Sequence, residues 1–124
     1  MKIIESKNAP LPIGPYSQAV EVNGFIFTSG QIAIDPSSNQ LIEGNAAEQT
    51  KQVLENLKQV LSAAGASLDN VVKTTIFIKN MDDFGAVNEV YAGYFSANRP
   101  ARSTVEVARL PKDVLVEIDC IAVK

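Results

Sequence analysis

The sequence contains no histidine, no tryptophan and a single cysteine, Cys120. A zinc site of the usual nitrogen and sulfur ligands cannot be assembled from these residues within one chain, so no metal site is expected. Ser-His-Asp and Cys-His catalysis are excluded as well, because both need an imidazole base. A disulfide framework needs at least two cysteines, so this composition is typical of an intracellular protein. An enzyme built from this chain has to work with carboxylates, arginines, hydroxyls, backbone groups and water.

Long apolar runs are missing too. No stretch approaches the roughly 20 apolar residues of a membrane span, and the first five residues, Met1 to Glu5, show no signal-peptide pattern. We therefore expect a cytoplasmic protein with no membrane partner. Its 124 residues, 46% hydrophobic and 20% charged, suffice for one core and not for two. The chain is predicted to form a single domain over residues 1–124.

Positive charge is scarce and unevenly distributed. Eleven lysines and arginines against fourteen acidic residues give a net charge of −3, which argues against nucleic acid as a partner. All three arginines, Arg99, Arg102 and Arg109, nevertheless fall within eleven residues. A cluster of this kind is either a solvated strand and turn or part of a functional site.

Turn signals and hydrophobic periodicity predict the order β-β-α-β-α-β-β. Asn23-Gly24 between two apolar runs indicates a hairpin of residues 18–22 and 25–29. The first helix is expected over 45–64, with Asn45 and Glu48 as a reciprocal cap and Gly65 at its end. A strand over 71–78, a second helix from 82 or 83 to about 95, and strands over 102–107 and 114–123 complete the chain. This order predicts an α+β fold in which two helices cover one face of a mixed sheet.

The last two strands carry an unusual mixture of residues. Alternation gives the final strand one wholly apolar face, made of Val114, Val116, Ile118, Cys120 and Ala122. If the two strands form a hairpin with Val107 opposite Val114, then Thr104 lies opposite Glu117 and Arg102 opposite Asp119. We therefore expect these four polar residues to share the other face, beside Leu115, Ile121 and Val123.

Such a face has two interpretations. It is either an exposed sheet face with cross-strand ion pairs, or a subunit interface that encloses a polar pocket. In the second case an arginine fork can hold a carboxylate with two hydrogen bonds, and a nearby glutamate can orient a water and move its proton. Together they suit a small 2-keto or 2-imino acid that is already reactive toward water.

Several segments resemble the RidA family (reactive intermediate deaminase A, also called the YjgF-type family). The matching residues are Gly14-Pro15-Tyr16-Ser17-Gln18-Ala19, Thr28-Ser29-Gly30-Gln31, Arg99-Pro100-Ala101-Arg102-Ser103, Val105 to Pro111, and Glu117. The resemblance runs nearly end to end. It implies a chorismate-mutase-like fold and a homotrimer whose sheets line a central β-barrel, with active sites between subunits.

The resemblance also implies an activity. Family members hydrolyse 2-iminobutanoate and 2-iminopropanoate, or their enamine tautomers, to 2-keto acids and ammonia, without a cofactor. These intermediates are released by pyridoxal-phosphate-dependent serine and threonine dehydratases, which are the implied functional partners. Arg102 matches the residue that holds the substrate carboxylate, and Glu117 matches the residue that positions the attacking water.

Four further positions correspond to the lining of the family's cleft or lie beside it. Tyr16, Ser29 and Asn88 match lining residues, although each has a structural alternative. These are, in turn, packing beside the proline-rich loop of residues 9–15, a hydrogen bond to the backbone, and a cap on a neighbouring backbone group. Thr104 replaces a cysteine common in the family, so a thiol-dependent function is in doubt while backbone contacts at this position are retained. Cys120 is expected to be a buried, inert thiol.

Other functions compete with deamination. Some family members are associated with translation inhibition, RNA cleavage, chaperoning or ligand-dependent regulation, and the motifs do not separate these roles. A chorismate-mutase-like pericyclic enzyme is suggested by fold analogy alone, which is a weak basis.

Overall fold

The computed structural model describes all 124 residues. Its strands are β1 (Lys2–Ile4), β2 (Ala19–Val22), β3 (Phe25–Thr28), β4 (Ile34–Asp35), β5 (Gln40–Leu41), β6 (Val71–Ile78), β7 (Ala101–Glu106) and β8 (Val116–Val123). Its helices are α1 (Ala46–Ala63) and α2 (Phe84–Tyr94), and three short 3-10 turns are η1 (Leu68–Asn70), η2 (Met81–Asp83) and η3 (Pro111–Asp113). Neither helix is long and apolar enough to cross a membrane.

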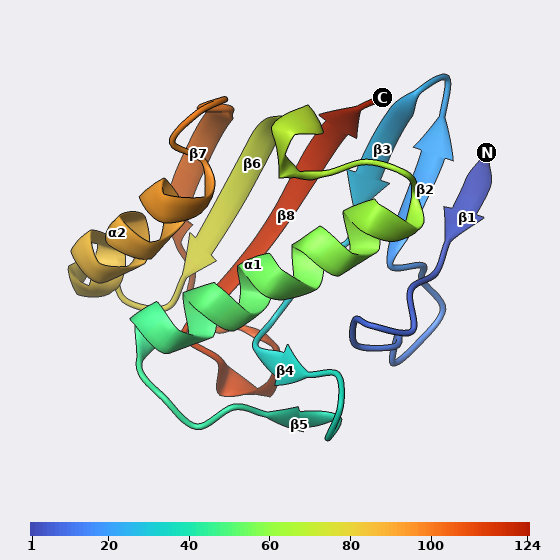
Figure 1. Cartoon of the computed structure of the whole chain (residues 1–124). Coiled ribbons are helices and arrows are strands. Elements are labelled where there is room, and N and C mark those ends of the chain that lie inside the picture. The colour runs from blue at the N-terminus through green and yellow to red at the C-terminus, as the bar shows by residue number, and fades with distance from the viewer.

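Six strands form one mixed sheet in the order β1-β2-β3-β8-β6-β7, and β4 pairs with β5 in a separate small hairpin. All neighbours in the large sheet are antiparallel except β6 and β7, which run parallel. Figure 1 shows α1 lying across the middle of the sheet and α2 beside β6 and β7, both on the same face. The α+β architecture and the mixed sheet with two helices on one face are therefore confirmed.

The core lies between the two helices and the sheet. Its buried residues come mainly from the apolar stripe of α1 and from alternate positions of β6 and β8. Leu54, Leu57 and Leu61 of α1 are fully buried there, and each such side chain contributes about 1.5–3 kcal/mol relative to an exposed position. The cap of α1 is as expected, because the Asn45 side chain accepts a hydrogen bond from the Glu48 amide and the Glu48 carboxylate accepts one from the Asn45 amide.

The predicted elements are found with small shifts at their ends, and the Asn23-Gly24 hairpin has the predicted register, with Val22 opposite Phe25. Strand β1, the β4-β5 hairpin and the 3-10 turns were outside the prediction. They are short, and segments of two or three residues carry too little periodicity to be recognised.

The predicted hairpin of the last two strands is wrong. Strand β6 lies between β7 and β8, and β7 pairs with β6 in parallel, so that Arg102 is in register with Thr74 and Thr104 with Ile76. The cause is α2, which carries the chain back to the start of β6 and so allows a parallel pairing. The expected pairs Thr104–Glu117 and Arg102–Asp119 therefore do not exist.

The new register also changes which residues share a face. Cross-strand partners point to the same side of a sheet. Arg102 aligns through Thr74 with Cys120, on the helix-covered face, whereas Glu117 aligns through Phe77 with Val105 on the opposite face. The prediction that Arg102 and Thr104 share a face with Glu117 and Asp119 is consequently wrong within one chain.

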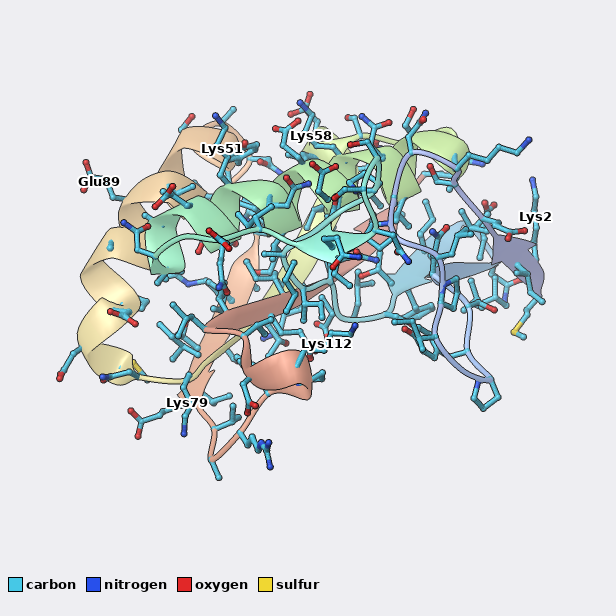
Figure 2. All side chains as sticks on the ribbon, turned by 90° about the horizontal axis from the view of Figure 1, so that it is seen from below. Lys2, Lys51, Lys58, Lys79, Glu89 and Lys112 are labelled. Carbon is cyan, nitrogen blue, oxygen red and sulfur yellow. The ribbon has the colours of Figure 1, made fainter.

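The face without helices, called here the open face, is rich in apolar side chains. Phe25, Phe27 and Val105 are each 40% to 44% exposed, and the rings of Phe25 and Phe27 stack with centroids 6.2 Å apart. Figure 2 shows the molecule from below, with Lys51 and Lys58 of α1 on the side of the sheet that the helices cover. An apolar sheet face next to half-buried carboxylates fits the interface interpretation better than the solvated one.

Candidate functional site

Arg102 projects from the edge strand β7 toward α2. Its Nη1 donates a hydrogen bond of 2.7 Å to Oδ1 of Asn88. Its guanidinium carbon lies 4.8 Å from the ring centroid of Tyr91 and 5.4 Å from that of Phe84. These rings attract the cation through their quadrupoles. The polar position on the apolar stripe of α2, Asn88, thus finds its partner in Arg102.

The aromatic support of Arg102 is itself fixed. Tyr91 is buried, its hydroxyl lies 2.7 Å from the Thr74 hydroxyl, and its ring packs on Phe95 with centroids 4.7 Å apart. Burial raises the pKa of Tyr91 above its ordinary value, so the phenol stays neutral beside the cation. The guanidinium therefore rests on a rigid surface, and only one of its N–H groups is bonded to another side chain.

The positive charge of Arg102 is not neutralised by the chain. The three ion pairs of the structure involve Lys58, Arg109 and Lys124. Arg102 and Arg99 instead line an open cavity of about 550 Å³, together with Asn88 and Tyr91. We call Asn88, Arg102 and Thr104 the arginine half-site. It offers an unpaired planar donor fork to an anion.

Glu117 lies on the open face of β8, in the interior of the sheet. Its side chain is partly buried, and burial, with a smaller contribution from Asp119, raises the pKa of its carboxyl. The pKa of Asp119 is also raised by burial, although a hydrogen bond from Thr75 and the charge of Lys73 oppose this. A carboxylate that holds its proton more readily than usual is suited to accept a proton from water near neutral pH.

Gly30 packs directly on the Glu117 carboxyl. A Cβ atom added to Gly30 would lie 2.7 Å from both Cδ and Oε2 of Glu117. The next residue, Gln31, forms two backbone hydrogen bonds with Ile118, at 2.9 and 3.2 Å. The segment after β3 is therefore held tightly against β8.

Tyr16 and Ser29 are connected to this carboxyl through Gly30, which Ser29 precedes in the chain and with which Tyr16 shares a cavity. They line one shallow cavity beside Phe27, and Tyr16 lines a second one, of about 310 Å³, together with Gly30 and Pro111. We call Tyr16, Ser29, Gly30 and Glu117 the glutamate half-site. The Ser29 hydroxyl donates to the Ser17 carbonyl at 2.6 Å.

The Tyr16 side chain also has a structural contact, because its hydroxyl accepts a hydrogen bond from the Ile13 amide at 3.3 Å. Both Tyr16 and Ser29 thus make the local contacts that their structural alternatives suggested.

Gln18 was absent from the sequence-based site residues. Its buried amide accepts a hydrogen bond from the Ser6 amide and donates to the carbonyls of Ser6, Ala9 and Pro10. It thereby ties the proline-rich loop, which directly precedes Tyr16, to the start of β2. A glutamine at an inward position of a predicted strand is the signal that could have found it, since a buried amide needs partners.

The two half-sites lie apart in one chain. Arg102 and Glu117 are on opposite faces of the sheet and two strands apart, which is roughly 10 Å at a strand spacing of about 4.8 Å. They are also three residues apart along the strand direction, because Arg102 is level with Thr74 and Glu117 with Phe77. No small substrate can contact both side chains of the same chain.

No group of three or more acidic, histidine or cysteine side chains is placed to hold a metal ion. The thiol of Cys120 is buried under the helices, and burial raises its pKa to about 12. A thiol with such a pKa is a poor nucleophile. The position of Cys120 agrees with the prediction that its thiol is buried and inert.

A family comparison decides the relationship that the motifs suggested. Residues 6–124 match the model of the family described as Endoribonuclease L-PSP. Among curated proteins, a RutC family protein of Synechocystis is 62% identical over 99% of this chain and 96% of its own length. The chain belongs to the RidA/L-PSP endoribonuclease family. Its resemblance to RidA proteins is thereby confirmed.

Other relatives of this RidA-family chain have more specific names. The 2-iminobutanoate/2-iminopropanoate deaminase of mouse is 51% identical over 99% of this chain and 91% of its own length. The crystal structure of E. coli TdcF with bound serine has a TM-score of 0.96 at 45% identity, covering 100% of this chain and 99% of that one. The YjgF gene product of E. coli has the same TM-score at 46% identity, with the same coverage of both chains. The fold is thus the fold of the family.

Proposed function

We propose that this protein hydrolyses small reactive 2-imino acids, such as 2-iminobutanoate and 2-iminopropanoate, to 2-keto acids and ammonia. The observation that carries the proposal is the division of charge between the half-sites: an unpaired arginine fork on one and a carboxylate of raised pKa on the other. The proposal is supported by relatives named 2-iminobutanoate/2-iminopropanoate deaminase, which are 49% and 51% identical to this chain over 99% of its length.

The arginine half-site binds the substrate carboxylate. Asn88 occupies one N–H of Nη1, and the other edge of the guanidinium remains for two parallel hydrogen bonds to a carboxylate. The rings of Tyr91 and Phe84 fix the plane of the fork. The substrate is thereby held with its C2 carbon at a fixed distance from β7, beside the Thr104 backbone.

The glutamate half-site activates water. The Glu117 carboxylate accepts a proton from a water molecule while the water oxygen bonds to C2 and the electron pair of the C=N bond moves to nitrogen. The nitrogen takes up protons, the C–N bond then breaks, and the C2 hydroxyl loses its proton as the carbonyl forms. One water is consumed and one ammonia released per imine, with no oxidant and no cofactor. Tyr16 and Ser29 line the space beside this water.

The active site is proposed to lie between subunits of a homotrimer. Two half-sites on opposite faces of one sheet can meet only if a neighbouring copy supplies the second. The apolar open face, with Phe25 and Phe27, provides the surface that such an assembly would bury around a central barrel. Light scattering should give about 40 kDa, three times the 13.3 kDa of the chain, and a stable monomer at micromolar concentration would contradict the trimer.

Such imines arise where pyridoxal-phosphate-dependent dehydratases act on serine and threonine, so these enzymes are the proposed suppliers of substrate and the cytoplasm the proposed location. A coupled assay with a threonine dehydratase measures imine loss with and without the protein. We expect strong acceleration, and a loss of roughly a hundredfold or more for Arg102→Ala, since a desolvated charge-assisted contact is lost. Full activity of Arg102→Ala, or no acceleration by the unaltered protein, would contradict the proposal.

RNA cleavage is the second candidate, because the matching family model has the name Endoribonuclease L-PSP. The net charge of −3 argues against it. Incubation of the same preparation with RNA distinguishes the two: cleavage that persists in Arg102→Ala, without imine hydrolysis, would favour the nuclease.

A further inference from the structure

Gly30 has a packing contact that the proposed mechanism does not yet use. An added Cβ would lie 2.7 Å from Cδ, 2.7 Å from Oε2 and 2.9 Å from Cγ of Glu117. Real Cβ atoms almost never approach other atoms so closely. The carboxyl of Glu117 therefore occupies the space that the side chain of any other residue would fill.

The backbone at this point is poorly able to yield. Gln31 is bonded to Ile118 through both its N–H and its carbonyl, and the Ser29 amide donates to the Gln18 carbonyl at 2.9 Å. Gly30 is thus held between two anchored residues. The Glu117 carboxyl, in contrast, is the far end of a flexible side chain, and burial together with the charge of Asp119 raises its pKa.

From this contact we infer that Gly30 is a positioning residue for Glu117: the missing side chain forms the cradle in which the water-activating carboxyl rests. The inference rests on the proposed function for its catalytic consequence, but the contact itself does not. A methyl group at position 30 turns the carboxyl out of the cradle while leaving the strand pairing intact. A displacement of about 1 Å at a reacting group can cost roughly a hundredfold in rate.

The test is Gly30→Ala in the imine hydrolysis assay. We expect kcat to fall roughly ten- to a hundredfold while KM changes little, because the substrate carboxylate is held by the arginine half-site. The matched control is Gly44→Ala. Gly44 also packs on a glutamate, with an added Cβ 3.0 Å from Cβ and Cδ of Glu48, but at the start of α1 and outside both half-sites. The activity of Gly44→Ala should equal that of the unaltered protein.

A double-substitution cycle separates the contact from a general effect on folding. Glu117→Ala removes all three atoms that a Cβ added at Gly30 would meet, namely Cγ, Cδ and Oε2. In that background Gly30→Ala should lower the Tm by much less than it does in the unaltered protein, since the clash no longer exists. A full additive loss would overturn the inference. If Gly30→Ala alone does not fold, recovery of folding in the double variant supports the contact, and no recovery contradicts it.

A second readout does not depend on activity. Carbon-13 NMR of the Glu117 carboxyl follows its titration. The neighbouring charge of Asp119 on β8 raises the pKa of Glu117, and Lys73 on β6 in turn lowers the pKa of Asp119. Displacement into solvent removes part of the burial, so Gly30→Ala should lower the pKa of Glu117 toward its ordinary value. An unchanged titration would refute the displacement. Inactive unaltered protein with the expected titration shift would instead refute only the proposed function.

Discussion

The two half-sites hold their charged groups in opposite ways. Arg102 lies on the edge strand β7, is exposed, and is oriented by a hydrogen bond from its Nη1 to Asn88 and by two aromatic rings. Glu117 lies on the interior strand β8, is partly buried, and is placed by packing against Gly30. Arginine keeps its charge in either setting, so it needs only orientation. The carboxylate of Glu117, which is proposed to exchange protons with water, also needs its pKa adjusted, and burial raises that pKa.

The largest expected effect on activity comes from substitutions that remove the charged group of one half-site, because the two half-sites lie on opposite faces of the sheet. Arg102→Ala and Glu117→Gln should each lose at least a hundredfold in activity, but unfolding and refolding a mixture of the two should restore part of it. If each site takes Arg102 from one subunit and Glu117 from its neighbour, about a quarter of the sites in randomly mixed trimers are intact. The measurement is imine hydrolysis before and after subunit exchange.

The control for this mixture replaces one partner by a chain that carries both substitutions. No intact site can then form, so activity should not recover. A mixture of the two single variants that also stays inactive would show that each site closes within one chain, and the comparison of two half-sites would fail.

A smaller effect is expected within the arginine half-site. Asn88→Ala removes the acceptor at 2.7 Å from Nη1 but leaves the charge and both rings. The guanidinium loses one constraint, so KM should rise roughly tenfold with kcat within about threefold. The matched control is Glu89→Ala on the same helix, whose side chain points away from the sheet in Figure 2. A fall in kcat alone would place Asn88 in the chemical step instead.

The smallest effect concerns stability in the glutamate half-site. The raised pKa of Glu117 means that the folded chain binds more protons than the unfolded chain between the ordinary and the raised pKa. Its contribution to the free energy of unfolding therefore falls as pH rises through that window. Glu117→Gln has no such group, so its Tm should exceed that of the unaltered protein by a few degrees at pH 7 and by less near pH 4.

Thermal unfolding at both pH values measures this difference, with Glu89→Gln at an exposed position of α2 as the matched control. A constant difference between pH 4 and pH 7 would show that burial does not alter the protonation of Glu117. Glu117 would then, like Arg102, be oriented by its neighbours without a change in its protonation, and the contrast between the two half-sites would not hold.

Local signals in the sequence were sufficient for most of the fold. The Asn23-Gly24 turn determined both the existence and the register of its hairpin, because the turn itself fixes which residues pair. The Asn45 cap and the apolar stripe of α1 located that helix within one residue at each end. The pairing of β7 could not be predicted in this way. Alternation shows that a strand has two faces but not which strand lies beside it, so the sequence did not determine whether Arg102 and Glu117 point to the same face of the sheet.

The sequence by itself therefore determined the inventory of this protein: an α+β fold without histidine, the family motifs, and Arg102 and Glu117 as the residues proposed to do the chemistry. These follow from residue identity and from contacts between neighbours along the chain. Only the tertiary structure decided that Arg102 lies under α2, that Glu117 lies against Gly30, and that the sheet separates them. The physical reason is that a parallel strand pair depends on the path of the helix between its strands, and that path is set by packing of the whole core.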